Sequence, residues 1–570
     1  MKKELNLYDV PKIESLQDMV LQSARKYGPK IALEDLNETP LKSLTYRELL
    51  DNVLLLGSAL KQLGIKERTH IALIGENRVQ WSLTYLTLMS FNYVVVPIDK
   101  NLNTNEIMNI IHESDSEAII FSGSYAGMIA DAKNSLKNLK HFICMDDTKE
   151  DKEFYSMMEL IRKSSPLDPS KMPIINPNDL AEIIFTSGSL GRAKGVMLSQ
   201  RNIASNLMAM TKMINIVETD RFLSVLPIHH TYECTCGMLC PLYSGASAHY
   251  ARSLKTVVDD LQKVQATLLL AVPLLYDKMF KRIMKGIKED KVKSVIVPPL
   301  VKFTNLFTSA GFKEVKKKIF HELHAKFGGS IRLFIAGGAA PDPMVAKGLR
   351  EFGFNFVQGY GLTETSPILA LNRLDAFKDN AAGLLLPGVE IKINKPDEFG
   401  SGEIWAKGPS VMLGYYKNEK ATNDTFEDGW FKTGDIGFFD EDGFLHINGR
   451  KKNVIISKSG KNVFPEEIED ILVRSPFVLE CLIFGEDDSK QGEIISAQIV
   501  VDAEAFIELS ETQKVKITEE LIHKKISEEI DKTNKELSAY KQIKKFYIRE
   551  NEFEKTTTQK IKRYLVNNPN

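Results

Sequence analysis

Short apolar segments alternate with helix-like segments in the N-terminal part of the chain, and this alternation constrains the fold more than any other feature. Apolar segments at 70–75, 93–98 and 117–122 are separated by helix-like stretches near 81–90 and 104–114. Strands that alternate with helices form parallel sheets whose faces are covered by the helices. The pattern therefore predicts an α/β fold built on a parallel sheet.

Four further apolar segments each end in a polar or glycine-rich loop. They lie at 222–226, 267–272, 331–336 and 355–357, and the loops that follow contain His229, His230, Gly337, Gly338 and residues 358–364. In open α/β sheets, ligands bind beyond the carboxyl ends of the strands. We therefore expect these loops to surround a ligand.

A chain of 570 residues is too long for one hydrophobic core, so several domains are expected. A helix is predicted over 45–63, because Thr45 can cap its start and Gly64 can end it. Glycine-rich apolar stretches at 381–446 predict a small β subdomain. Residues 453–570 carry strands of their own and a charged helix near 518–530, which predicts a compact α+β domain.

Composition excludes some classes of protein. A hydrophobic content of 43% is typical of globular proteins, and a net charge of −1 gives no general attraction to nucleic acid. No apolar run follows the two N-terminal lysines, and the longest apolar run, at 266–276, is too short to cross a bilayer. Five cysteines in so long a chain indicate a reducing compartment. A cytoplasmic location is therefore expected.

A loop at 186–195 combines hydroxyl side chains, glycines and one lysine, Lys194. Glycines let backbone N–H groups approach a ligand, and such turns form anion sites. The loop therefore suggests a polyphosphate ligand, with an ordinary surface loop as the alternative. It is not a Walker A loop, because Lys194 stands between Ala193 and Gly195.

Four further motifs, at 358–364, 428–435, 449–452 and 555–563, stand in order after this loop. Together the five resemble the adenylate-forming superfamily, which includes acyl-CoA synthetases, adenylation domains and luciferases. The resemblance runs from about Thr45 to Arg563. It implies an N-terminal AMP-binding domain over 1–448 with parallel α/β sheets and a β subdomain. A hinge at 449–452 and a small mobile α+β domain over 453–570, carrying a catalytic lysine, would follow.

The resemblance also implies roles for single residues. The β- and γ-phosphates of ATP would be held by Thr186, Ser187, Gly188, Ser189, Gly191 and Lys194. Tyr360 would stack on adenine, Thr363 would touch the α-phosphate, and Glu364 would hold Mg²⁺ together with Thr186. The backbone around the nucleotide would come from Gly338, Gln358, Gly359 and Gly361.

Further roles fall near the C-terminus. Asp435 would accept hydrogen bonds from the ribose hydroxyls, Arg450 would lie near ribose and phosphates, and Lys452 would be the hinge residue. Lys560 would reach the α-phosphate and the substrate carboxylate, where a cation neutralises the charge of two reacting anions. Catalysis would thus depend on Lys560, Glu364 and Thr186.

The chain departs from the family pattern at three positions. Leu190 replaces a small hydroxyl residue, which would remove one phosphate contact. Ile456 stands where many members have lysine, and Gln559 replaces the glycine before Lys560. His230 and Gly337 match positions that line the acyl pocket.

Within the superfamily, long-chain fatty acyl-CoA synthetases look closest, because they share a long insertion at 279–329. The expected activity is that of an acid–thiol ligase, which converts a medium- or long-chain fatty acid to acyl-AMP and then to acyl-CoA. The alternatives are a ligase for a shorter or aromatic acid and an acyl-[acyl carrier protein] synthetase. Residues 278–326 contain 13 Lys and Arg against four Asp and Glu. This basic segment is either a solvated helical pair or a peripheral contact with an anionic membrane.

Two other classes of protein were weighed. A metal protein is suggested by the cluster of His229, His230, Cys234, Cys236 and Cys240, but it lacks the second, separated pair of ligands that zinc sites usually have. A binding protein without catalysis is disfavoured, because Lys560, Glu364 and Asp435 are all present.

Overall fold

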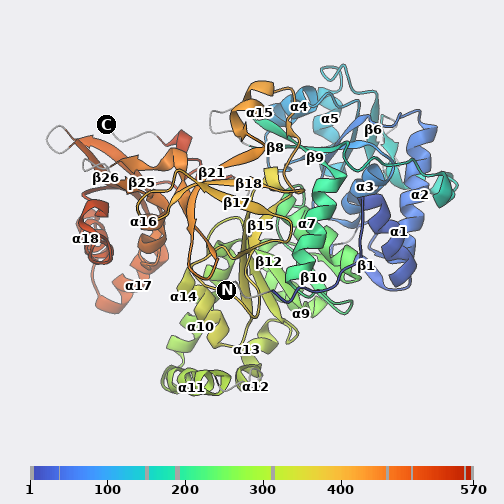
Figure 1. Ribbon diagram of the computed structural model, residues 1–570. Helices are drawn as coiled ribbons and strands as arrows, with labels where there is room; N and C mark the ends of the chain where they lie inside the picture. The colour runs from blue at the N-terminus through green and yellow to red at the C-terminus, as the bar shows by residue number, and fades with distance from the viewer. Residues whose placement is uncertain are drawn as a thin grey trace. The chain divides into compact units, whose positions relative to one another are not determined.

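The computed structural model describes residues 5–37, 39–147, 153–186, 193–309, 315–456, 461–488, 492–556 and 560–566. The chain forms two compact units (Figure 1). The first contains Met1–Ile391, Ala406–Phe431 and Glu441–Leu445, and the second contains Lys392–Trp405, Lys432–Asp440 and His446–Asn570. The α/β fold is confirmed, while the proposed boundaries at 448 and 453 stay predictions.

The first unit contains a nine-stranded sheet. Its order is β16 (Leu384–Leu385), β15 (Ile368–Leu371), β14 (Phe356–Gly361), β13 (Leu333–Ala336), β12 (Leu268–Ala271), β10 (Arg221–Ser224), β11 (Ser247–Tyr250), β1 (Ile31–Asp35) and β2 (Ser43–Thr45). The strands from β14 to β1 pair in parallel, and the outer pairs are antiparallel. The predicted parallel sheet is thus present.

A second sheet of eight strands lies in the same unit. Its order is β19 (Gly414–Tyr415), β9 (Lys194–Ser199), β8 (Leu180–Thr186), β4 (Val94–Ile98), β3 (His70–Ile74), β5 (Ala118–Phe121), β6 (His141–Cys144) and β7 (Tyr155–Ser156). The central strands β3, β4 and β5 are almost wholly apolar and buried, as expected of parallel strands that are covered on both faces.

Both sheets share one large apolar core with the helices packed against them. That core includes α1 (Leu16–Tyr27), α2 (Tyr46–Gln62), α3 (Val79–Ser90), α7 (Gln200–Met213), α8 (Cys240–Ser244) and the π-helix at Tyr232–Leu239. Two further cores cover the outer faces. One includes α9 (Val257–Val264), α10 (Pro273–Glu289), α13 (His321–Lys326) and α14 (Pro343–Glu351), and the other includes α4 (Thr104–Glu113) and α5 (Ala126–Ala132). Thr45 caps α2 through a reciprocal bond pair with Glu48, as its sequence predicts.

The basic insertion folds as helices between β12 and β13. Long α10 is followed by α11 (Lys291–Ser309) and α12 (Val315–Ile319), and α11 contains Pro298 and Pro299 (Figure 1). Among the described helices, none is both long and apolar enough to cross a membrane.

The second unit is built mainly from two small sheets. The five-stranded sheet, part of which lies in the first unit, contains β17 (Glu390–Asn394), β18 (Gly402–Lys407), β20 (Phe426–Glu427), β21 (Trp430–Phe439) and β22 (Leu445–Arg450). The other contains β25 (Val478–Asp488), β26 (Gly492–Val501) and β27 (Lys545–Arg549), with α16 (Pro465–Leu472), α17 (Ala503–Gln513) and α18 (Glu519–Glu536) packed around one core. The predicted β subdomain and α+β segment are both present.

Two strands run further than expected. The segment predicted to end at Val357 continues as β14 to Gly361, because β15 returns beside it and pairs Tyr360 with Ala370. Likewise β22 extends through Gly449 to Arg450, so part of the predicted hinge is strand.

Candidate active site

The four strands expected to end at a ligand site are neighbours. Their order in the sheet is β14, β13, β12 and β10, and all four pair in parallel. Their carboxyl ends therefore lie along one edge. His229, Gly337 and residues 362–364 consequently follow their strands on that side, whereas residues 358–361 are the last residues of β14 itself.

The turn after β13 favours glycine at two positions, at Gly337 for lack of space and at Gly338 because of its backbone conformation. A Cβ on Gly337 would overlap the ring of Tyr232, and Gly338 has φ +85°, which favours glycine. The N–H of Gly337 donates to the carbonyl of Ala271 at 3.3 Å. Glycine at both positions therefore has a local structural reason, whatever the turn binds.

The end of β14 and the short helix that follows it are held by backbone contacts. A Cβ on Gly361 would overlap the carbonyl oxygen of Pro367, and the N–H of Leu362 donates to that oxygen at 3.0 Å. Glu364 lies in a short 3-10 helix, Thr363–Thr365, and its carbonyl accepts from the N–H of Met412 at 2.9 Å. Tyr360, Thr363 and Glu364 are all half-buried, so their side chains are held and yet reachable.

Gln358 has a structural task. Its side chain is buried and its Nε2 donates to the carbonyl of Asp379 at 2.9 Å. The sequence predicts this residue in the ATP site, and the structure shows that its amide N–H is engaged with backbone. Gly359 lies next to it on β14 and lines an apolar pocket.

The predicted phosphate loop connects the antiparallel strands β8 and β9. Thr186 and Lys194 face each other at the end of this hairpin, and Oγ1 of Thr186 donates to the carbonyl of Lys194 at 3.5 Å. Ser187, Gly188, Ser189, Leu190 and Gly191 lie outside the described residues. The hairpin belongs to the eight-stranded sheet, whereas Glu364 follows a strand of the nine-stranded sheet.

Tyr415 links these two sheets at the candidate site. It pairs with Val196 across β19 and β9, and Nζ of Lys194 lies 4.8 Å from the centre of its ring. Its hydroxyl donates to Oε1 of Glu364 at 2.9 Å. One tyrosine thereby contacts both the loop lysine and the candidate magnesium carboxylate. Tyr415 was not predicted as a site residue; its only signal in the sequence is the aromatic pair that follows Gly414, at 415–416.

In the second unit, Asp435 and Arg450 form an ion pair. Oδ1 of Asp435 lies 2.9 Å from Nε of Arg450, and the carboxylate side chain is 6% exposed. The two residues come from β21 and β22, which are neighbours in one sheet. The N–H of Asp435 donates to Oγ1 of Thr433 at 3.1 Å, which fixes the backbone beside the carboxylate.

Arg450 and Asp435 act on the pKa values of both Lys452 and Lys560. Burial and the positive charge of Arg450 lower the pKa of both lysines, and Asp435 acts in the opposite sense. Although part of the Lys560 side chain is exposed, desolvation of its ammonium is the largest cause of its shift. Oγ1 of Thr556 accepts a hydrogen bond from the backbone N–H of Lys560 at 3.2 Å. Gln559 lies outside the described residues.

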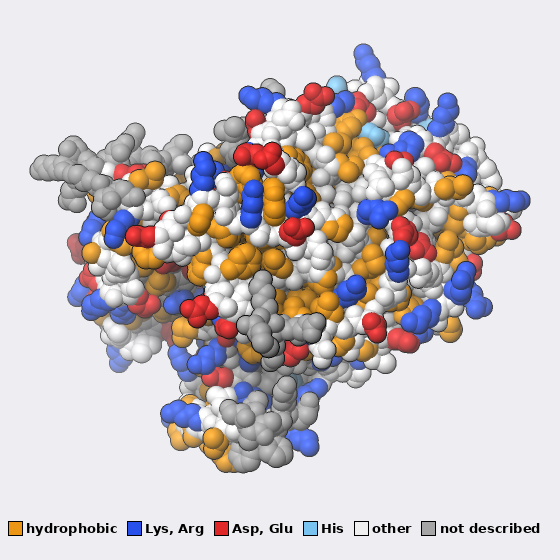
Figure 2. Space-filling view, in the orientation of Figure 1, with side chains coloured by type: hydrophobic (Ala, Val, Ile, Leu, Met, Phe, Trp, Pro, Cys, Tyr) orange, Lys and Arg blue, Asp and Glu red, His pale blue; other side chains and the backbone are white. Residues whose placement is uncertain are grey.

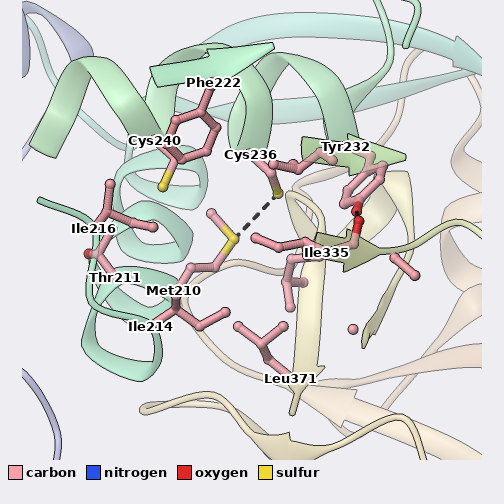
Figure 3. A pocket seen from close by; sticks show the side chains of 14 residues that line it. Met210, Thr211, Ile214, Ile216, Phe222, Tyr232, Cys236, Cys240, Ile335 and Leu371 are labelled. Carbon is pink, nitrogen blue, oxygen red and sulfur yellow. Dashed lines mark hydrogen bonds between the residues drawn. The ribbon is translucent and has the colours of Figure 1, made fainter. Parts of the chain in front are cut away.

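An apolar pocket opens among β10, β12, β13, β14 and the helices beside them (Figure 3). Its free volume is about 470 Å³, including the part open to solvent. The side chains that define it are Met210, Ile214, Phe222, Cys236, Cys240 and Leu371. Sγ of Cys236 donates to Sδ of Met210 at 3.5 Å, which closes one wall (Figure 3). His230 and Gly337, predicted pocket residues, are not among the described lining residues, although Ala336 and Tyr232 beside them are.

The cysteines after His230 are buried in the apolar core. Burial raises the pKa of Cys234 and Cys236 well above the ordinary thiol value and that of Cys240 to about 12. A metal ligand must be a thiolate, so these side chains behave as apolar groups. Among the described residues, the histidines instead group with Asp99.

The nucleotide motifs, the strand edge and the C-terminal unit define an adenylate-forming enzyme. The AMP-binding enzyme family model matches residues 20–416, and the AMP-binding enzyme C-terminal domain model matches residues 467–560. The chain therefore belongs to the AMP-binding enzyme family. This confirms the resemblance on which the site residues were predicted.

Curated relatives are similar over most of their length. The chain is 26% identical to long-chain-fatty-acid–CoA ligase FadD15 of Mycobacterium bovis, covering 98% of this chain and 96% of the relative. It is 30% identical to long-chain-fatty-acid–CoA ligase 1 of Cavia porcellus, and the match covers 82% of this chain and 71% of the relative. It is 28% identical to long-chain-fatty-acid–[acyl-carrier-protein] ligase AEE15 of Arabidopsis thaliana, covering 85% and 76%.

Solved structures share the fold. The anthranilate CoA ligase AuaEII in complex with anthranoyl-AMP has a TM-score of 0.77 at 20% identity, covering 98% of this chain and 97% of that one. ATP-bound MatB from Rhodopseudomonas palustris has a TM-score of 0.76 at 23% identity, covering 96% and 97%. At these identities the likeness concerns the fold.

Proposed function

We propose that this chain is an AMP-forming acid–thiol ligase for medium- or long-chain fatty acids. A carboxylate oxygen attacks the α-phosphorus of ATP, forming acyl-AMP and releasing pyrophosphate. The thiol of CoA then attacks the acyl carbon, forming a thioester and releasing AMP. Family membership and the fatty-acid ligases among the curated relatives support this assignment.

The apolar pocket is the observation that carries the substrate class. Ala336, at the end of β13, and Gly359, near the end of β14, line the pocket. The pocket therefore adjoins the strand ends where the predicted nucleotide motifs lie. Two polar groups within it are engaged: the hydroxyl of Tyr232 donates to the carbonyl of Ile335, and that of Thr211 to Leu207. An alkyl chain suits such walls, and its carboxylate would remain at the strand ends.

Chain length provides the test of this assignment. Each buried methylene contributes about 0.8 kcal/mol, so two more should raise kcat/KM by roughly tenfold until the pocket is full. AMP release with CoA should be measured for saturated acids of graded length. Saturating activity with acetate or coumarate, and none with palmitate, would reassign the enzyme to the shorter- or aromatic-acid alternative.

ATP binding is proposed at the β8–β9 hairpin and the turn after β14. Lys194 would neutralise the terminal phosphates, and Tyr360 would stack on adenine. Asp435 would bind the ribose hydroxyls, and Lys560 would approach the α-phosphate while acyl-AMP forms. Charge neutralisation of this kind is the main contribution that proteins make to phosphoryl and adenylyl transfer.

Mg²⁺ is the proposed cofactor, and the described donors fit it. Thr186 offers a hydroxyl and Glu364 a carboxylate, the oxygen donors that Mg²⁺ prefers. The hydroxyl of Tyr415 donates to Oε1 of Glu364, which orients that carboxylate. Bound Mg²⁺ would neutralise phosphate charge, while Thr186 and Glu364 would hold it and Lys194 would add a second cation.

CoA is the proposed thiol, with acyl carrier protein as the alternative acceptor. Both acceptors occur in the names of curated relatives. The two are distinguished by supplying acyl-AMP with either acceptor and measuring thioester. A preference for the carrier protein at equal concentration would overturn the assignment to CoA without affecting acid activation.

We also propose that α11 contacts an anionic membrane. Large apolar residues are exposed at helical spacing along one face: Val292, Val295, Ile296, Phe303 and Leu306. Basic and apolar side chains lie together over α11 and α12 at the lower edge of Figure 2. Exposed apolar stripes flanked by cations bind the interface of acidic bilayers, where fatty acids reside.

Vesicle sedimentation tests this contact. Binding to acidic vesicles should exceed binding to neutral ones and should weaken as salt rises, because exposed charges are screened. Val295→Ser with Leu306→Ser should reduce it, whereas Ile174→Ser, which changes an apolar residue that is 95% exposed elsewhere, should not. Equal binding to neutral and acidic vesicles at low salt would overturn the proposal. A cytoplasmic location with peripheral membrane contact would be checked by cell fractionation.

A further inference from the structure

Asp99, His229 and His230 form a compact cluster, of which only His230 is given a role above, as a predicted residue of the acyl pocket. One donor atom from each lies within 4.8 Å of the others. Asp99 follows β4 of the eight-stranded sheet, and the histidines follow β10 of the nine-stranded sheet. The two imidazole centres lie 4.2 Å apart. Residues distant in sequence are thus brought together between the sheets.

His229 supplies a second, independent observation. Its side chain is 6% exposed, and its Nε2 is buried without a hydrogen-bond partner. An unsatisfied buried nitrogen is costly and calls for an explanation. Oδ2 of Asp99 lies 3.5 Å from it, close to the edge of about 3.4 Å between two ligands of a tetrahedral zinc with usual bond lengths.

The cluster lies beside the phosphate hairpin. β4 and β8 pair in parallel with Val95 opposite Glu182. Continuing both strands by the same distance places Asp99 level with Thr186. Neighbouring strands lie about 4.8 Å apart, so an ion held by Asp99 would stand next to the start of the phosphate loop.

The donor set selects the kind of ion. Two imidazoles and one carboxylate suit Zn²⁺, whereas Mg²⁺ prefers oxygen donors and keeps several waters. Three protein ligands leave one tetrahedral position open. That position would be available to a water molecule, a phosphate oxygen or a substrate carboxylate.

We propose that Asp99, His229 and His230 bind Zn²⁺, and that zinc bound there inhibits acid activation. The ion would hold the loop after β10 against β4 and would draw anionic oxygens away from Thr186 and Lys194. The inhibitory part rests on the proposed ligase function, while binding can be measured without it.

Binding is tested by calorimetric titration of the full chain with Zn²⁺. One tight site is expected, and His229→Gln or Asp99→Asn should weaken it by at least tenfold. His446→Gln is the matched control, because Nε2 of His446 lies 2.8 Å from Oδ2 of Asp440 without a second histidine. Circular dichroism checks that each variant is folded. Asp99 and His229 follow different strands, so if one variant fails to fold, the other still tests the site. Unchanged affinity in both folded variants would overturn the site.

Inhibition is tested in acid-dependent ATP–pyrophosphate exchange, which contains no thiol to capture zinc. Free Zn²⁺ is set by a metal buffer, and each variant is compared with its own zinc-free rate. His229→Gln should need at least tenfold more zinc than the wild type for half-inhibition. Equal sensitivity would overturn the inhibitory role. If no acid supports exchange, the ligase assignment fails, and the calorimetric result still decides the metal site.

Discussion

Replacing Tyr415 by phenylalanine removes one hydroxyl from the candidate site and leaves the ring in place. The lost interaction is the 2.9 Å hydrogen bond from the hydroxyl to Oε1 of Glu364. The ring can still face Nζ of Lys194, which lies 4.8 Å from its centre. The variant therefore removes the contact that orients the carboxylate of Glu364, while it keeps the contact between the ring and Lys194.

The magnitude follows from the kind of bond that is lost. A hydrogen bond to a charged group contributes about 1.5–3 kcal/mol, and about 1.4 kcal/mol corresponds to a tenfold change. Tyr415 is buried, so water can replace its hydroxyl only in part. Tyr415→Phe should raise the Mg²⁺ concentration for half-maximal exchange by about tenfold, with a smaller change in the maximal rate.

A second variant gives the comparison. Tyr415→Leu also removes the cation–π contact, which contributes about 0.5–2 kcal/mol and should appear as a weaker affinity for ATP. Both variants are assayed by fatty-acid-dependent ATP–pyrophosphate exchange across Mg²⁺ and ATP concentrations, with circular dichroism as the folding control. An unchanged Mg²⁺ requirement in folded Tyr415→Phe would refute the role given to Glu364 and its tyrosine.

Three other variants test different parts of the enzyme. Lys560→Ala should abolish ATP–pyrophosphate exchange yet still form thioester from supplied acyl-AMP and CoA; equal loss of both would contradict a role in one step. Gly361→Ala should lower thermal stability and exchange together, because its Cβ would overlap Pro367; unchanged melting would contradict this packing. Burial raises the pKa of Glu182 to about 8, so the folded state keeps a proton that the unfolded state loses, and stability falls as pH rises from about 5 to 8. The melting temperature of Glu182→Gln, relative to wild type, should therefore rise over that range, and a constant difference would contradict the protonated carboxyl.

Much of the fold could be predicted from local patterns. The strands β3, β4 and β5 are apolar runs, and α2 carries a cap at Thr45 with a partner at Glu48. These signals lie within each element, so they can be recognised without knowing which other elements pack against it. The basic segment is helical, as one of its two interpretations expected, although α11 runs through Pro298 and Pro299, where proline removes a backbone hydrogen bond and usually breaks a helix.

The extent of β14 and the contacts of the site depend on residues far away in sequence. Nothing local to Tyr360 shows that Ala370 will pair with it and extend the strand. Tyr415 meets Lys194 and Glu364 because β19 adds to the edge of the second sheet, a pairing decided by tertiary packing. Asp99 joins the histidines for the same reason. The motifs predict roles for single residues, but they do not predict contacts such as those of Tyr415 and Asp99, which come from distant parts of the chain.

The charges of the second unit give a physical reason for two successive steps. Desolvation and the positive charge of Arg450 lower the pKa of Lys560, and an anion bound beside it would act in the opposite sense. Two opposite charges 4 Å apart near a protein surface attract each other by about 4 kcal/mol, so a bound polyphosphate would favour the charged form of this lysine. ATP supplies that negative charge, and most of it leaves with pyrophosphate. We therefore expect acyl-AMP formation itself to weaken the attraction between Lys560 and the bound nucleotide, so that Lys560 matters less for thioester formation, as the Lys560→Ala variant tests.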